Sequence, residues 1–83
     1  MTIREYIEEI STDEPIIVAD GLDEALIGVT NSSPIRAVYS VQKILDILIT
    51  RDGMSKLEAI EFFDFNIADA FVGECTPIYV NHP

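Results

Sequence analysis

The first segment of the chain mixes apolar and acidic positions at helical spacing. Its isoleucines fall at i, i+4 and i+7, so they form one apolar stripe while the glutamates between them face water. Thr2 and Glu5 stand three residues apart in a capping-box pattern, in which both side chains satisfy backbone N–H groups of the first turn. The pattern predicts an amphipathic helix over residues 3–11, with Ile3, Ile7 and Ile10 inward.

Three short runs rich in β-branched residues follow, each bounded by turn residues. They span residues 15–20, 25–30 and 35–39, and the turn dipeptide Asp20-Gly21 separates the first two. Because short connections join neighbouring strands as hairpins, these runs predict a three-stranded antiparallel meander.

Two further helices and a last strand are predicted after the meander. Ser40 can cap a helix over residues 41–52, whose apolar positions cover most of its circumference and therefore place it centrally. Ser55 and Glu58 form a second capping box, which opens a helix that we expect to end near residues 65–66. This helix is expected to face inward through Leu57, Ile60 and either Phe63 or one of its neighbours. Residues 78–80 predict the final strand.

The predicted order is α-β-β-β-α-α-β, an α+β domain with helices packed on one face of a mostly antiparallel sheet. A chain of 83 residues suits one small domain and leaves no room for a second. Within residues 1–83, we assign 1–14 to the acidic helix and its connection, 15–80 to the α+β core, and 81–83 to a tail.

Charge narrows the range of partners. Fifteen Asp or Glu against five Lys or Arg give a formal charge of −10, concentrated in residues 1–24 and 58–83, whereas residues 25–57 are slightly basic. Repulsion from phosphate backbones and anionic lipids makes nucleic acid and membranes poor partners. A single cysteine excludes an intrachain disulfide, and the acidic N-terminus is unlike a signal peptide, so we expect a cytoplasmic protein.

Three motifs carry a resemblance to known proteins: DGLDEALIGV at residues 20–29, EAIEFFDFN at residues 58–66 and VGECTP at residues 72–77. Together with the residues between them, over 18–80, they resemble a family of small tailed-phage proteins. No biochemical activity is assigned to that family, so the resemblance implies a viral origin and the host cytoplasm as the place of action. It transfers no catalytic residue.

The usual signatures of enzymes are missing, so we predict no catalytic residue and no cofactor. His82 stands next to the C-terminus, where an imidazole rarely finds an orienting partner, and Cys75 is expected to be a small loop or core residue. A metal-dependent enzyme is the reading that we rank last. It would use acidic residues around one turn, which lack the spacing of a calcium loop: Asp20, Asp23 and Glu24.

Aromatic residues gather late in the chain and leave two interpretations open. Phe62 and Phe63 are adjacent, so on a helix they point about 100° apart and one is more exposed unless another surface covers it. The group forms either a thick core under the last helices or a surface for self-association or for a partner; self-association would make a homo-oligomer. The candidate self-association residues are Phe62, Phe63 and Phe65.

The basic middle of the chain offers an alternative function. If its cations converge, they can hold the phosphates of a nucleotide-like ligand in a pocket between protomers, with a tyrosine stacked on the base. The candidate ligand-binding residues are Arg36, Tyr39, Lys43 and Arg51.

The leading hypothesis is a non-enzymatic phage protein that modulates a host factor or host defence. We expect its acidic surface to dock on a basic surface of a host protein, because complementary charge speeds encounter. The candidate partner-binding residues lie on the outward faces of the first and last predicted helices: Glu5, Glu8, Glu9, Glu58, Glu61 and Asp64.

Overall fold

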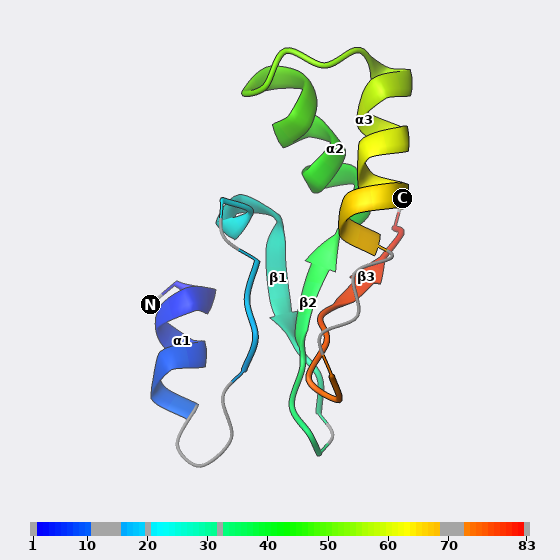
Figure 1. Cartoon of the computed structure of the whole chain (residues 1–83). Coiled ribbons are helices and arrows are strands. Elements are labelled where there is room, and N and C mark those ends of the chain that lie inside the picture. The colour runs from blue at the N-terminus through cyan, green and yellow to red at the C-terminus, as the bar shows by residue number, and fades with distance from the viewer. Residues whose placement is uncertain (1, 11–15, 20, 32, 69–72, 83) are drawn as a thin grey trace.

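The chain folds into helices and a small sheet, seen in a computed structural model that describes residues 2–10, 16–19, 21–31, 33–68 and 73–82 (Figure 1). The α+β class predicted from the sequence is confirmed. In chain order the elements are α1 (Ile3–Ile10), the 3₁₀ turn η1 (Asp23–Ala25), β1 (Leu26–Val29), β2 (Ala37–Ser40), α2 (Val41–Thr50), α3 (Lys56–Phe62), the π-helix η2 (Phe63–Ala68) and β3 (Ile78–Val80).

The capping box at the start of α1 forms as predicted. The Glu5 backbone N–H donates to Thr2 Oγ1 at 3.1 Å, and the Thr2 backbone N–H donates to Glu5 Oε1 at 3.4 Å. Ile7 is buried, and α1 contacts β1. The helix therefore attaches to the domain through its isoleucine stripe and leaves its glutamates exposed.

The sheet has three strands in the order β1-β2-β3, and it is mixed. β1 and β2 pair antiparallel, whereas β2 and β3 pair parallel, with Val38 opposite Ile78. The prediction of a mostly antiparallel sheet is therefore wrong for the second pair. The physical reason is the path of the chain, because two helices carry it back before it re-enters the sheet as β3, and such a crossover produces parallel neighbours.

The predicted strand over residues 15–20 is not confirmed. Residues 16–19 form no strand, while its two ends, positions 15 and 20, lie outside the described residues. The Ala19 backbone N–H donates to the hydroxyl oxygen of Tyr39 at 2.8 Å, and Ile16, Val18 and Ala19 pack against the core. The Tyr39 hydroxyl thus accepts a backbone N–H that would otherwise donate to the backbone of a neighbouring strand.

Both later helices begin at the predicted caps. Ser40 Oγ accepts from the Lys43 backbone N–H at 3.2 Å and starts α2. Ser55 and Glu58 form a complete capping box at the start of α3. The expected end near residues 65–66 is too early, because the chain continues through η2 with the wider turns of a π-helix.

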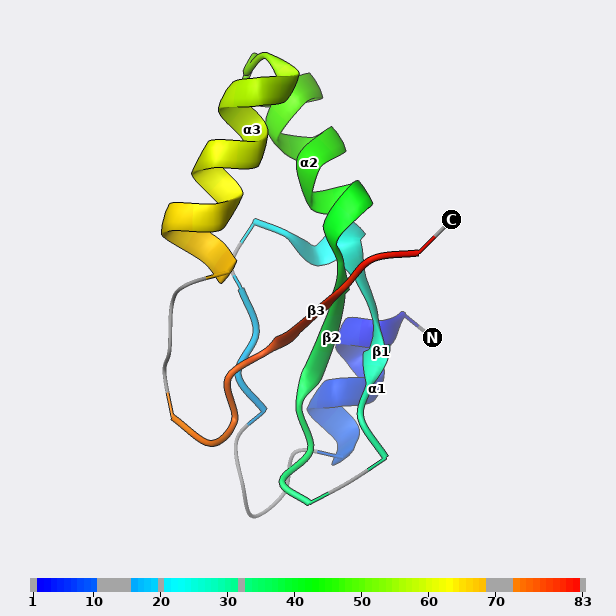
Figure 2. The ribbon, with the colours of Figure 1, turned by 90° about the vertical axis from the view of Figure 1, so that its right-hand side faces the viewer.

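The helices do not stack on one face of the sheet as predicted. Ser40 is both the last residue of β2 and the N-cap of α2, so the chain passes from strand to helix without a turn. In two perpendicular views, α2 and α3 form a hairpin beyond the end of the sheet, while α1 lies beside β1 (Figures 1 and 2). The domain is elongated as a result, with extents of 40 × 27 × 23 Å.

The core lies where the sheet meets α2. Its largest fully buried side chains include Tyr39 from β2 and Ile44 and Leu48 from α2. Ala59 and Phe63 attach the last helical segment to this core. Among the described residues, no helix is long and apolar enough to cross a membrane.

Candidate functional site

The outer face of α3 and η2 exposes large apolar side chains. Leu57 is 66% exposed and Phe65 is 78% exposed, and Ile60 and Phe62 are also exposed. The expected inward positions of Leu57 and Ile60 are therefore wrong. The inward position predicted for Phe63 is confirmed, and Ala59 joins it in a buried stripe at i and i+4 that leaves Leu57 and Ile60 exposed.

The three aromatic residues predicted for self-association divide between core and surface. Phe63 is buried, and its ring meets that of Tyr79 edge to face, with centroids 5.5 Å apart. Phe62 and Phe65 remain exposed. Phe63 is thus part of the core rather than of a partner surface, and adjacent Phe62 and Phe63 divide between exposed and buried positions, as their helical spacing predicted.

A hollow of about 330 Å³ lies on this outer face, and we call it the α3 notch. Two aromatic rings, from Phe62 and Phe65, and two carboxylates, from Glu58 and Glu61, contribute to its walls. Met54 and Asn66 complete the lining. Both carboxylate residues and Phe65 are exposed, so the notch is open to solvent and combines negative charge with aromatic surface.

Hydrogen bonds hold one of these carboxylates in its charged form. The Ser55 backbone N–H donates to Glu58 Oε1 at 3.1 Å. This bond, followed by one from the Ser55 side chain, lowers the pKa of the Glu58 carboxyl below its ordinary value, because both favour the anion. The capping box therefore fixes a negative charge at the edge of the α3 notch.

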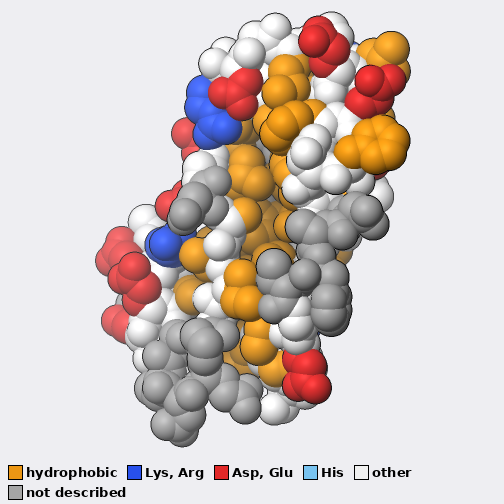
Figure 3. Space-filling model, in the orientation of Figure 1, with side chains coloured by type: hydrophobic (Ala, Val, Ile, Leu, Met, Phe, Trp, Pro, Cys, Tyr) orange, Lys and Arg blue, Asp and Glu red, His pale blue; other side chains and the backbone are white. Residues whose placement is uncertain are grey.

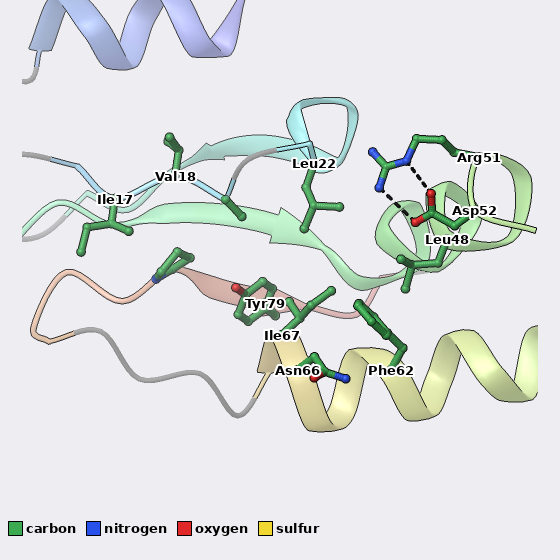
Figure 4. Close-up of a pocket in the computed structure, with 12 residues that line it drawn as sticks. Ile17, Val18, Leu22, Leu48, Arg51, Asp52, Phe62, Asn66, Ile67 and Tyr79 are labelled. Carbon is green, nitrogen blue, oxygen red and sulfur yellow. Dashed lines mark hydrogen bonds and ion pairs between the residues drawn. The ribbon is translucent and has the colours of Figure 1, made fainter. Parts of the chain in front are cut away.

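A second hollow, of about 400 Å³, lies between the end of the sheet and the two last helices, and we call it the central groove. Phe62 and Ile67 face Leu22 and Leu48 across it, and Tyr79 forms part of its floor (Figure 4). Apolar side chains follow the middle of this face of the molecule (Figure 3). Phe62 and Asn66 line both hollows, so the α3 notch and the central groove are neighbours.

One end of the central groove carries a closed ion pair. Arg51 donates from Nε and Nη2 to the two carboxylate oxygens of Asp52, at 3.0 and 3.2 Å. These bonds raise the pKa of Arg51 and lower the pKa of Asp52. Arg51 Nη1 also donates to the carbonyl oxygen of Gly21 at 2.5 Å. Gly21 has φ +81°, and a Cβ there would lie 3.3 Å from Arg51 Nη1, so glycine suits this close approach.

The predicted acidic surface divides into two separate groups (Figure 3). Glu5, Glu8 and Glu9 are exposed on α1, where Arg4 contacts Glu8 at 3.9 Å and Asp23 of η1 at 3.0 Å. The second group consists of exposed carboxylates on α3 and η2: Glu58, Glu61 and Asp64. The α1 group stands beside one exposed aromatic residue, Tyr6, whereas the second group lies among several exposed large apolar side chains, including Phe62 and Phe65.

The residues predicted to bind a nucleotide-like ligand do not form one site. Tyr39 is 0% exposed, so its ring cannot stack on a base. The Arg36 guanidinium donates from Nε to the carbonyl oxygen of Thr76 at 2.6 Å and links the approaches to β2 and β3. Lys43 and Arg51 stand near opposite ends of α2, about 12 Å apart along its axis.

Three candidates for chemistry remain from the sequence: His82, Cys75 and the acidic turn at residues 20–24. His82 Nε2 lies 2.6 Å from Ser40 Oγ, and the His82 backbone N–H donates to Gln42 Oε1 at 3.3 Å, so the imidazole is held at the start of α2. Cys75 is a free, half-buried cysteine. No group of three metal-ligating side chains occurs within the described ranges, which leave out Asp20 of the suggested turn.

Sequence reasoning missed two residues of the α3 notch. Asn66 follows Phe62 at i+4, a spacing that places two side chains on one helical face and could have linked them. Met54 lies in the connection between α2 and α3, and no local pattern marks it. The central groove was missed because its walls come from segments far apart in the chain.

These features define a small α+β domain with a mixed sheet and an exposed helix face that combines aromatic and acidic side chains. Comparisons of the chain with protein-family models, with curated proteins and with solved structures found no match.

Proposed function

We propose that this chain is a phage-encoded, non-enzymatic binding protein that acts in the host cytoplasm and modulates a host factor or host defence. It docks on a basic surface of a host protein. The observation that carries the proposal is the outer face of α3 and η2, where Leu57 and Phe65 are largely exposed among three carboxylates. The phage origin rests on the sequence resemblance alone.

The composition of this face resembles that of protein interfaces. A well-packed interface has an apolar, aromatic centre and a polar rim, and exposed apolar patches of this kind mark interaction sites. Here the aromatic rings supply the centre, while Glu58, Glu61 and Asp64 supply a rim of one sign. Such a rim steers a basic partner towards the surface and speeds association at low salt.

Charge favours a foreign partner over a second copy of the chain. Each copy carries −10, so pairing two α3 faces would bring their carboxylates together at the edge of the joint. A basic partner removes this repulsion and gains complementary contacts instead.

The two other functions considered from the sequence rank lower. Capture of a nucleotide-like ligand would need Arg36, Tyr39, Lys43 and Arg51 near one another, and the first two are engaged within the fold. A metal-dependent enzyme that would use the acidic residues between positions 20 and 24 is the function that we rank last.

Affinity capture from host lysate tests the proposal. The tagged protein is expected to retain a host protein at low salt and to release it at high salt, since exposed charge pairs are screened. Two charge-removing triple variants locate the surface: E58Q/E61Q/D64N on the last helical segment and E5Q/E8Q/E9Q on α1. Glutamine at position 58 keeps a capping-box residue.

The proposal is supported if a retained protein is lost with either triple variant. It is contradicted if nothing is retained at low salt, or if retention is the same for both variants and the wild type.

A further inference from the structure

We infer that the α3 notch and the central groove together bind a short partner segment in which an arginine stands beside a bulky apolar residue. The arginine enters the notch and the apolar side chain enters the groove. This inference rests on the proposed function and deepens it, because it names the recognition element of the basic partner.

The α3 notch has the chemistry that a guanidinium group needs. Its two rings, from Phe62 and Phe65, offer π faces for a planar cation, and arginine stacks on aromatic faces more readily than lysine. Its two carboxylates, from Glu58 and Glu61, can accept the N–H groups of the cation. The Ser55 hydrogen bond to Glu58 Oε1 positions one acceptor before any partner arrives.

The central groove calls for a different side chain. Its walls are mainly aliphatic and aromatic, and its volume of about 400 Å³ exceeds what one apolar side chain fills. The Arg51 guanidinium already pairs with both oxygens of Asp52, so the groove offers no net charge for a charged group. An apolar side chain gains the most there, because it leaves water without losing polar contacts.

The contact between the two hollows links the two side chains in one segment. Phe62 and Asn66 line both, so a residue bound in one hollow lies close to a residue bound in the other. Neighbouring positions of a single peptide satisfy this arrangement. The −10 charge of the chain selects a cationic segment over an anionic ligand or a second copy.

A titration with a defined peptide tests the inference. The probe is the acetylated and amidated peptide Ala-Leu-Arg-Leu-Ala, added to isotope-labelled full-length protein at low salt and followed by amide chemical shifts. We expect the largest shifts around residues 58–66 and at Tyr79, which lines the groove. Replacing arginine by citrulline, a neutral analogue of similar shape, should weaken binding about five- to tenfold. Replacing both leucines by alanine should weaken it similarly.

Matched variants separate the notch from general surface effects. Phe65→Ala should weaken binding about three- to fivefold, because it removes one π face. Tyr6→Ala on α1 is its control, since Tyr6 is an exposed aromatic residue outside both hollows. It should change the dissociation constant by less than about twofold. Glu61→Gln should weaken binding about two- to fivefold, whereas Glu9→Gln on α1 should not.

Three results would overturn the inference: shifts confined to other parts of the molecule, equal binding of the citrulline peptide, or equal effects of F65A and Y6A. Thermal unfolding of each variant checks its fold, and the exposure of residues 6 and 65 makes both substitutions mild. Failure here differs from failure of the proposed function. A host protein retained through the α1 carboxylates alone would keep the function and reject this site.

Discussion

At the scale of single residues, buried polar groups hold separate segments together. Tyr39 is fully buried in β2, and its hydroxyl oxygen accepts the Ala19 backbone N–H from a segment that belongs to no strand. Ser40 is also fully buried, and its Oγ lies 2.6 Å from His82 Nε2. Two adjacent residues of β2 thus hold other segments in place: Tyr39 contacts Ala19, and Ser40 contacts His82.

Removing the Tyr39 hydroxyl tests the first of these contacts. Tyr39→Phe should lower the free energy of unfolding by about 1–3 kcal/mol, because it leaves the Ala19 N–H without its hydroxyl acceptor. Tyr79→Phe is the matched control on the neighbouring strand, since Tyr79 makes ring contacts in the described structure but no hydroxyl hydrogen bond there. Urea denaturation measures both. Equal losses in the two variants would show that the Ala19 contact contributes nothing of its own.

At the scale of elements, the capping box of α3 does two things. It satisfies backbone N–H groups of the first turn, and it places the Glu58 carboxylate at the edge of the α3 notch. Removing the Ser55 cap should lower the free energy of unfolding by about 1 kcal/mol at neutral pH. The same hydrogen bonds also couple the stability of the helix to pH.

The sign of this coupling follows from the lowered pKa of Glu58. The folded state holds the carboxyl proton less tightly than the unfolded chain, so its stabilisation is present above pH 4.5, the ordinary value, and is lost as pH falls through the lower folded pKa. Glu58→Gln should therefore reduce the loss of stability on acidification, and Ser55→Ala should do the same. Urea denaturation across the acidic range measures it. An E58Q profile parallel to that of the wild type would contradict this role.

At the scale of the whole molecule, the distribution of charge and apolar surface decides which contacts are possible. The fold separates the carboxylates of α1 from those of α3 and η2 (Figure 3), and it places two exposed phenylalanines, Phe62 and Phe65, beside the second group. A surface that is both apolar and acidic favours a basic partner and disfavours its own copy.

The oligomeric state of the isolated protein tests whether repulsion between copies outweighs burial of the exposed aromatic side chains. The isolated protein at low salt should scatter light as a single chain of 9.2 kDa, because repulsion between copies that each carry −10 opposes the burial of Phe62 and Phe65. A stable dimer at low salt would contradict the expectation and would support self-association through the exposed aromatic face. Phe65→Ala would then be expected to dissociate that dimer, whereas Glu9→Gln would not.

Local signals in the sequence predicted the elements that depend on neighbouring residues. The caps at Thr2, Ser40 and Ser55 formed where expected, because a cap needs only a hydroxyl and the N–H groups within one turn. The runs predicted at 25–30 and 35–39 became β1 and β2, which pair antiparallel. The exposed acidic positions of α1 and α3 also followed from helical periodicity.

Only the tertiary structure decided the rest. Periodicity cannot fix which side of α3 meets the core: it placed Phe63 inward correctly but Leu57 wrongly, whereas the fold buries Ala59. Nor can it show that β3 pairs parallel with β2, or that Tyr39 is closed off from any ligand, because both depend on residues about 20 to 40 positions away. The sequence alone therefore determined the helices, their caps and the net charge, which are local or additive properties. The position of the α3 notch and the central groove came from long-range packing, which brings distant segments into contact.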